Sequence, residues 1–151
     1  MIMGIDPGQK GGVALLSDPD TILRVEAMPI LNKEVQSGWL YALIDAFCPS
    51  QVIVERQMIM SGQRGAMAIG SNFGRILAAI EIASVPYTLV TPTSWNRRAG
   101  IPAKLKGKDK KEASFAAARR TWGRQFDRLG LRPTQDGQVE ALLIARYGLD
   151  S

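Results

Sequence analysis

The sequence predicts one α/β domain in which helices flank a mixed sheet. Its length of 151 residues is ordinary for a single domain. Its 46% hydrophobic and 22% charged residues are close to the average of soluble globular proteins. The third observation is the order of local patterns: three strand-like segments come first, and helical and strand-like segments then alternate. This order favours three antiparallel strands extended by two parallel ones, in a single domain over residues 1–151.

The first three strands are short and are joined by tight turns. We expect strands at Met1–Ile5, Gly11–Ser17 and Thr21–Met28. The turn signals DPG at residues 6–8 and DPD at residues 18–20 separate them. Short strands connected in this way form an antiparallel meander.

Helices and strands alternate in the rest of the chain. Apolar residues recur at helical spacing over 33–47, and the compact apolar run Gln51–Val54 is typical of a strand buried on both faces. After a loop-like segment, residues 68–83 predict a second helix and Tyr87–Val90 predicts a fifth strand. The remaining expected elements are a short helix at 94–99, a helix from about Lys110 to Trp122, a polar connection, and a closing helix at Asp136–Tyr147.

The absence of histidine and the near absence of cysteine exclude several classes of catalytic and metal site. Histidine is absent and Cys48 is the single cysteine, which excludes an intrachain disulfide, a Ser-His-Asp triad, a Cys-His pair and a His-ligated zinc site. Catalysis would therefore use carboxylates, lysines or hydroxyls. The chain shows neither an apolar stretch of membrane-spanning length nor a signal-peptide pattern at its start. We expect a cytoplasmic protein in a reducing compartment, with no membrane partner.

Charge is distributed unevenly along the chain. Residues 1–90 carry six Lys or Arg against eight acids, a net charge of −2, whereas residues 91–151 carry thirteen against six, a net charge of +7. A basic half suggests a polyanion partner, chiefly nucleic acid, although a solvated basic face explains the charge equally well. The densest run is expected to be a loop and contains Lys104, Lys106, Lys108, Lys110 and Lys111.

Four acids lie at places that suggest one site. Asp6 and Glu55 stand where the first and fourth strands end, and ligands of open α/β sheets gather beyond strand ends. Asp136 and Glu140 are four residues apart at the start of the last helix, on one helical face. Each acid also has a plain structural interpretation, because Asp6 suits a turn, Glu55 could pair with a nearby arginine (Arg56 or Arg64) and Asp136 could cap a helix.

Taken together, the acids suit a metal site. Carboxylates without histidine or cysteine are ligands for hard cations such as Mg²⁺ or Mn²⁺. Two such ions ~3.5–4 Å apart can activate a water and stabilise the leaving oxygen in phosphodiester cleavage. The sequence therefore suggests that acids hold metal ions and lysines hold nucleic acid.

Several motifs resemble one known family in the right order along nearly the whole chain. GIDPG at residues 4–8, VIVER at 52–56 and DGQVEALLIARYG at 136–148 are similar to RuvC-type Holliday junction resolvases of the RNase H-like superfamily. The intervening segments 71–95 and 108–122 resemble the shorter, phage-type members. The resemblance implies an RNase H-like sheet and the cytoplasm of a bacterial or phage-infected cell.

The resemblance also implies an activity. It implies a homodimeric endonuclease, dependent on Mg²⁺ (two ions, with Mn²⁺ as a substitute), that nicks two strands of a four-way DNA junction symmetrically and leaves 5′-phosphate and 3′-hydroxyl ends. By position, Asp6 would bridge the metals, Glu55 would ligate one, and Glu140 would take the place of the family's last acid. Asp136 would be the fourth ligand, and Lys111 would lie near the scissile phosphate, with its neighbour Lys110 as a possible substitute.

The chain departs from the family pattern at three positions. Gly137 stands where bacterial members have an acid, Met58 stands where they have an aromatic wedge, and Asn96 stands where phage-type members have a lysine. Met58 could insert between bases or face the core. The residues expected to contact DNA are Met58, Arg64, Arg97, Arg98, Lys104, Lys106, Lys108 and Lys110.

Two alternative functions stay open at this point. One is an RNase H-like nuclease with another substrate, either RNA or branched DNA in general. The other is a catalytically silent junction-binding protein. We expect no nucleotide cofactor, because 151 residues leave no room for the two domains that clamp ATP in the sugar kinase and actin class.

Overall fold

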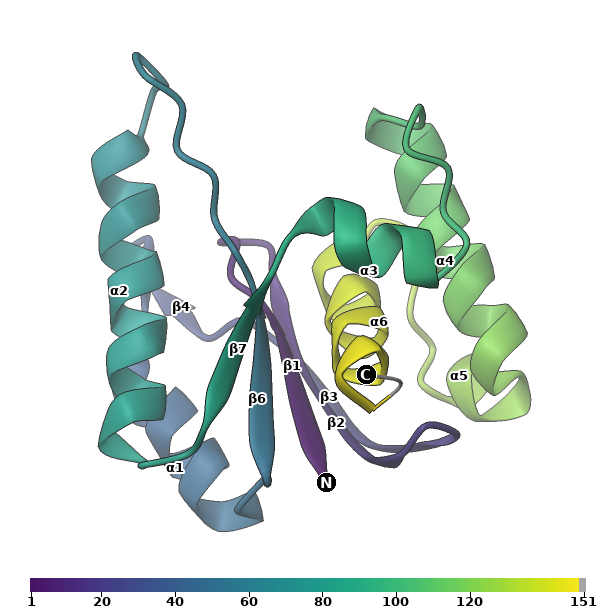
Figure 1. Cartoon of the computed structure of the whole chain (residues 1–151), viewed down its shortest axis with the longest axis horizontal. Helices are drawn as coiled ribbons and strands as arrows, with labels where there is room; N and C mark the ends of the chain where they lie inside the picture. Colours follow the sequence, from purple (N-terminus) through teal and green to yellow (C-terminus); the bar gives the residue numbers. More distant parts are fainter. Residues whose placement is uncertain (150–151) are drawn as a thin grey trace.

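The centre of the molecule is a five-stranded mixed sheet of order β3-β2-β1-β6-β7. This is a computed structural model, and it describes residues 1–149. The pairs β1–β2 and β2–β3 are antiparallel, and β1–β6 and β6–β7 are parallel. The predicted mixed sheet is therefore confirmed (Figure 1). The strands are β1 Ile2–Asp6, β2 Gly12–Asp18, β3 Thr21–Ala27, β6 Gln51–Glu55 and β7 Tyr87–Val90.

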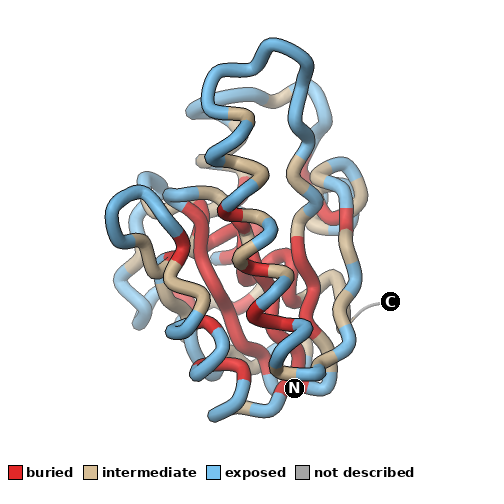
Figure 2. The backbone as a smooth tube through the Cα atoms, turned by 90° about the vertical axis from the view of Figure 1, so that its left-hand side faces the viewer, coloured by how far each residue is buried: buried red, intermediate tan, exposed pale blue. Residues whose placement is uncertain are grey.

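Helices cover both faces of this sheet. In Figure 1, α1 and α2 lie on one side and α3 to α6 on the other. Strand β1 is buried from both sides because Met3 and Ile5 join the cluster under α1 and α2, whereas Ile2 joins the cluster around α6. Figure 2 shows the buried strands at the middle of the chain trace. The helices are α1 Ser37–Phe47, α2 Ala66–Ile82, α3 Pro92–Arg98, α4 Gly107–Trp122, α5 Arg124–Arg128 and α6 Asp136–Leu149.

Glycines allow α6 to approach the sheet very closely. A Cβ on Gly4 of β1 would lie 2.3 Å from the carbonyl oxygen of Ala141, and one on Gly12 of β2 would lie 2.6 Å from Cα of Gln138. Such distances are far below van der Waals contact, so a side chain at either position would push the helix away. The start of α6 is therefore held beside the end of β1.

The structure differs from the sequence prediction in three places. Residues 33–36 do not begin α1, because β4 (Ile30–Leu31) and β5 (Glu34–Val35) form a small hairpin there. The side chain of Asn72 stabilises it by accepting from Val35 N at 2.9 Å and donating to the carbonyl oxygen of Lys33 at 3.0 Å. The connection after α4 contains α5, and α4 itself begins at Gly107, so part of the lysine-rich segment is helical instead of loop.

Within residues 1–149, no helix combines the length and the apolar character that crossing a membrane requires.

Candidate active site

Asp6 and Glu55 are the last residues of two adjacent parallel strands. Ile5 of β1 pairs with Val54 of β6, so the two acids that follow leave the sheet side by side. Both are partly buried. Asp6 Oδ1 accepts a long hydrogen bond of 3.4 Å from the backbone N–H of Gly8, in the turn that the DPG sequence predicts.

Glu140 reaches the same place from α6. Its side chain is 11% exposed, which is unusual for a glutamate on a helix. Two groups of α4 contact its Oε1: Ser114 Oγ donates to it at 3.3 Å, and Lys110 Nζ lies 3.0 Å away. The close packing of α6 on β1 brings this carboxylate towards the strand ends.

The three carboxylates influence one another electrostatically. Burial, together with the negative charges of Glu55 and Glu140, raises the pKa of Asp6 to about 7. Burial and the charge of Glu140 also raise the pKa of Glu55, against the opposing effects of its hydrogen bond from Trp95 and of the Lys110 charge. Three acids thus share one lysine, which leaves an excess of negative charge in a partly dry site.

Trp95 of α3 contacts a carboxylate and an ammonium, although it is not among the predicted site residues. Its Nε1–H donates to Glu55 Oε2 at 2.7 Å, and Lys110 Nζ lies 5.1 Å from the centroid of its ring. The indole is fully buried. In the sequence, Trp95 stands among polar residues at the end of the segment 71–95 that resembles the phage-type resolvases, and that resemblance gave no indication of its contacts with Glu55 and Lys110.

Asp136 and Lys111 form a separate pair. Lys111 Nζ lies 3.2 Å from both carboxylate oxygens of Asp136. Asp136 is not among the groups that shift the pKa of Asp6 or Glu55. The structure therefore brings three of the four predicted acids together, and it places Lys110, rather than Lys111, against them.

Steric hindrance explains why position 137 is a glycine. Gly137 pairs with Gly11 in an isolated backbone bridge, and a Cβ on Gly137 would lie 2.1 Å from the carbonyl oxygen of Lys10. No acidic side chain fits at this position in this backbone, so Asp136 is the nearest acid that the start of α6 can carry.

The donor chemistry of the three acids fits a hard divalent cation. Carboxylate oxygens are the ligands of Mg²⁺ and Mn²⁺, and a cation relieves the mutual repulsion that raises the pKa of Asp6. Among residues 1–149, no group of three or more Asp, Glu, Cys or His side chains is arranged so that it could hold a metal ion in this structure. The ammonium of Lys110 supplies the positive charge that contacts Glu140.

The predicted DNA-contacting residues lie mainly on two projections beyond the ends of β1 and β6 (Figure 1). The loop before α2 carries Met58, which is 69% exposed, so the alternative of a core-facing methionine is wrong. Arg64 of the same loop lines a pocket of about 240 Å³ with Gly8 and Gln57. The other projection is the start of α4 with the segment before it. Its exposed lysines are Lys104, Lys106 and Lys108.

Arg97 and Arg98 lie in the last turn of α3 and are exposed. Arg97 lines a pocket of about 570 Å³ that Lys110 also borders. Arg98 lines a different pocket, of about 220 Å³, beside α6. Of the two arginines, Arg97 is thus the one that shares a surface with a residue of the acidic site.

Comparison of the structure with solved structures gives extensive matches. Thermus thermophilus RuvC in complex with a Holliday junction substrate matches with a TM-score of 0.66 and 24% identity, over 97% of this chain and 90% of that one. The chain has the RuvC-type fold. Fowlpox virus resolvase, in complex with Holliday junction DNA, shares this fold with a TM-score of 0.59 and 13% identity, over 99% of both chains. The yeast mitochondrial Holliday junction resolvase matches with a TM-score of 0.57 and 17% identity, over 98% of this chain and 77% of that one.

No family model matches the sequence, and no curated protein matches it. The structural matches confirm the RuvC-type fold that the sequence motifs predicted. The cluster of Asp6, Glu55 and Glu140 lies at the ends of the two central parallel strands of this fold.

Proposed function

We propose that this chain is a metal-dependent endonuclease that cleaves four-way DNA junctions. The observation that carries the proposal is the convergence of Asp6, Glu55 and Glu140 at the ends of β1 and β6, where Glu55 and Glu140 raise the pKa of Asp6 and Glu140 raises the pKa of Glu55. A protein that only binds DNA gains nothing from buried negative charge facing phosphates. The same cluster suits a protein that holds cations against a DNA strand.

The roles of the residues follow from their places. Asp6, Glu55 and Glu140 would hold the two Mg²⁺ ions, with Asp6, whose pKa both other acids raise, as the proposed shared ligand. Bound divalent ions would supply an activated water and a stabilised leaving oxygen for phosphodiester hydrolysis, which leaves 5′-phosphate and 3′-hydroxyl ends. Lys110 offers an ammonium at the edge of the cluster that can contact the scissile phosphate. We keep Asp136 and Lys111 as proposed residues of the site. They form an ion pair with each other beside the cluster of three acids.

The surroundings of the cluster support DNA as the substrate. The exposed lysines at and before the start of α4 lie on one side of the strand ends, and the loop that carries Met58 and the exposed Arg64 lies on the other. Two of the structures with this fold contain Holliday junction DNA. Basic groups on both sides of an acidic centre can hold the phosphate backbone while the acids act on one phosphate.

Symmetrical nicking requires two active sites, and we propose a homodimer through the outer face of α2. Met67 is 89% exposed and Ile82 is 71% exposed on this helix, and a Cβ on Gly74 would meet no atom within 4 Å. Apolar side chains flanking an open glycine suit close packing against a second copy.

The test is cleavage of labelled four-way junction, Y-fork, linear duplex and RNA–DNA hybrid in Mg²⁺. We expect nicks at the junction, abolished in Asp6→Asn, while junction binding survives. Asp45→Asn is the matched control, because it makes the same charge change on the exposed face of α1. Equal cutting of linear duplex would refute junction selectivity, and binding without cleavage in the parent protein would favour the silent junction-binding alternative.

A further inference from the structure

Trp95 connects the acidic cluster to the core of the protein. Its indole is fully buried, in a helix whose first turn is fixed by Thr91, which caps the N-terminus, and by Pro92. The ring therefore cannot turn without disturbing the core cluster around α6 to which it belongs.

The hydrogen bond to Glu55 fixes one carboxylate oxygen. The indole N–H is a donor that has no acceptor function, and Glu55 Oε2 at 2.7 Å is its partner. Leaving a buried N–H without a partner is costly, so this bond restrains the orientation of the carboxylate. The other oxygen, Oε1, is left for a cation.

The ring face restrains the opposite charge. Lys110 Nζ lies 5.1 Å from the ring centroid and 3.0 Å from Glu140 Oε1. A lysine has a flexible four-carbon stem, and an aromatic face attracts its ammonium without donating or accepting a proton. One side chain thus limits the freedom of both a carboxylate and an ammonium.

We propose that Trp95 is a positioning residue that orients Glu55 and Lys110 for the reaction. The inference rests on the proposed function, because the two groups it orients are the ones assigned there to the metal and the phosphate. Trp95 itself contacts neither metal nor substrate. Outer contacts of this kind typically change metal affinity by about 10- to 100-fold when they are removed.

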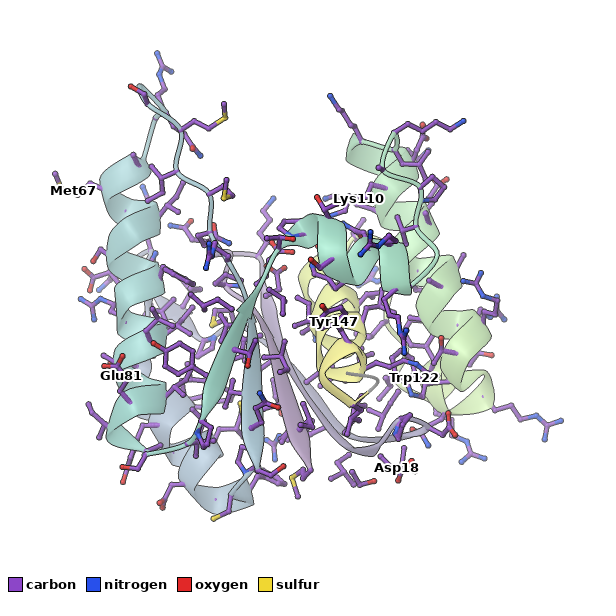
Figure 3. The ribbon with its side chains drawn as sticks, in the orientation of Figure 1. Asp18, Met67, Glu81, Lys110, Trp122 and Tyr147 are labelled. Atoms are coloured by element: carbon purple, nitrogen blue, oxygen red, sulfur yellow. The ribbon has the colours of Figure 1, made fainter. Side chains whose placement is uncertain are left out.

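Trp122 offers a matched control in the same molecule. It is also buried in the core cluster around α6, its Nε1–H donates to the carbonyl oxygen of Pro19 at 3.1 Å, and Arg146 lies 5.9 Å from its ring centroid. Figure 3 shows Trp122 far from Lys110, towards the other end of α4. Trp122→Phe removes the same N–H from the same core without touching the acids.

The first measurement is calorimetric titration of the DNA-free protein with Mn²⁺. We expect Trp95→Phe to weaken Mn²⁺ binding by about 10-fold or more, while Trp122→Phe leaves it unchanged. In a Glu55→Gln background, Trp95→Phe should cause little further loss, because the partner of its N–H has lost its charge. Wild-type Mn²⁺ affinity in Trp95→Phe, or an equal loss in both backgrounds, would overturn the inference.

The second measurement needs no metal. In ¹H–¹⁵N spectra of the metal-free protein, the indole resonance of Trp95, assigned with Trp95→Phe, should move in Glu55→Gln and in Lys110→Met, while that of Trp122 stays in place. An unmoved Trp95 resonance in either variant refutes the corresponding contact and with it the inference. If the parent protein binds no Mn²⁺, the proposed function fails, whereas the resonances still decide on the positioning by Trp95.

Discussion

Asp6→Asn should stabilise the metal-free protein at and above neutral pH, although it removes the residue on which the proposed chemistry most depends. Asparagine has nearly the same shape as aspartate and keeps an oxygen for the N–H of Gly8. It carries no charge to be penalised by burial or repelled by Glu55 and Glu140. Comparing the variant with the parent protein therefore measures how much one ionised carboxylate in the site lowers the free energy of unfolding.

The size of this cost follows from the pKa of Asp6. The folded protein releases the proton at about pH 7, compared with an ordinary value of 3.8. This difference corresponds to roughly 4 kcal/mol as an upper limit. Because the folded pKa is raised, the contribution of Asp6 to stability is complete below about pH 4 and is lost as the pH rises to about 7. Above that pH the Asp6→Asn variant, which has no charge at this position, retains the unfolding free energy that the parent protein has lost by ionising Asp6.

Urea denaturation with EDTA between pH 4 and pH 8 measures the effect. We expect Asp6→Asn to exceed the parent protein in unfolding free energy by a few kcal/mol at pH 8 and to equal it near pH 4. Asp45→Asn should follow the parent protein at every pH. Mg²⁺ should raise the stability of the parent protein at pH 8 and should have little effect on Asp6→Asn. Equal stabilities at pH 8 in EDTA would refute the cost of an ionised Asp6 that burial and the two neighbouring carboxylates impose.

Three further predictions concern the packing and the basic groups. Gly137→Ala should destabilise the protein by about 2–3 kcal/mol in thermal denaturation, because its Cβ meets backbone, whereas Gly38→Ala on the open face of α1 should not. Lys110→Met should lower kcat for junction cleavage by about 10²-fold, and Lys111→Met should lower it less; the reverse order would favour the motif-based assignment of Lys111. Lys106→Gln should weaken junction binding and reduce its salt dependence by about one released counterion in a binding titration over NaCl.

The strands could be predicted because their signals are local. The apolar run that ends at Glu55 and the DPG turn after Asp6 mark two strand ends without reference to the rest of the chain. The hairpin of β4 and β5 could not be predicted, because its turn needs a positive φ at Lys33 as well as at Asn32, and lysine adopts this conformation infrequently. Its stability depends on Asn72, nearly forty positions later in the chain.

The contacts within the acidic site depend on packing between distant elements. Trp95 and Glu55 are forty residues apart, and their hydrogen bond joins α3 to the end of β6. Gly4 and Gly12 also depend on a distant element. They are needed because α6 packs against them, and not because of the conformation of their own strands. The charged residues of the candidate site can be named from the sequence, whereas the hydrogen bonds that the neutral Trp95 and Ser114 donate to Glu55 and Glu140 cannot.

The sequence does not determine which of Lys110 and Lys111 contacts the acidic cluster. Consecutive helical residues differ by about 100° in direction, and both lysines border the buried face of α4 that includes Ser114. Asp136 and Glu140 lie one turn apart on α6. Two lysines therefore face two acids, and either pairing would form two ion pairs. The structure pairs Lys111 with Asp136 and Lys110 with Glu140. This pairing removes the charge of Asp136 from the balance and leaves Asp6, Glu55 and Glu140 with one ammonium, which is the excess negative charge that a divalent cation can neutralise.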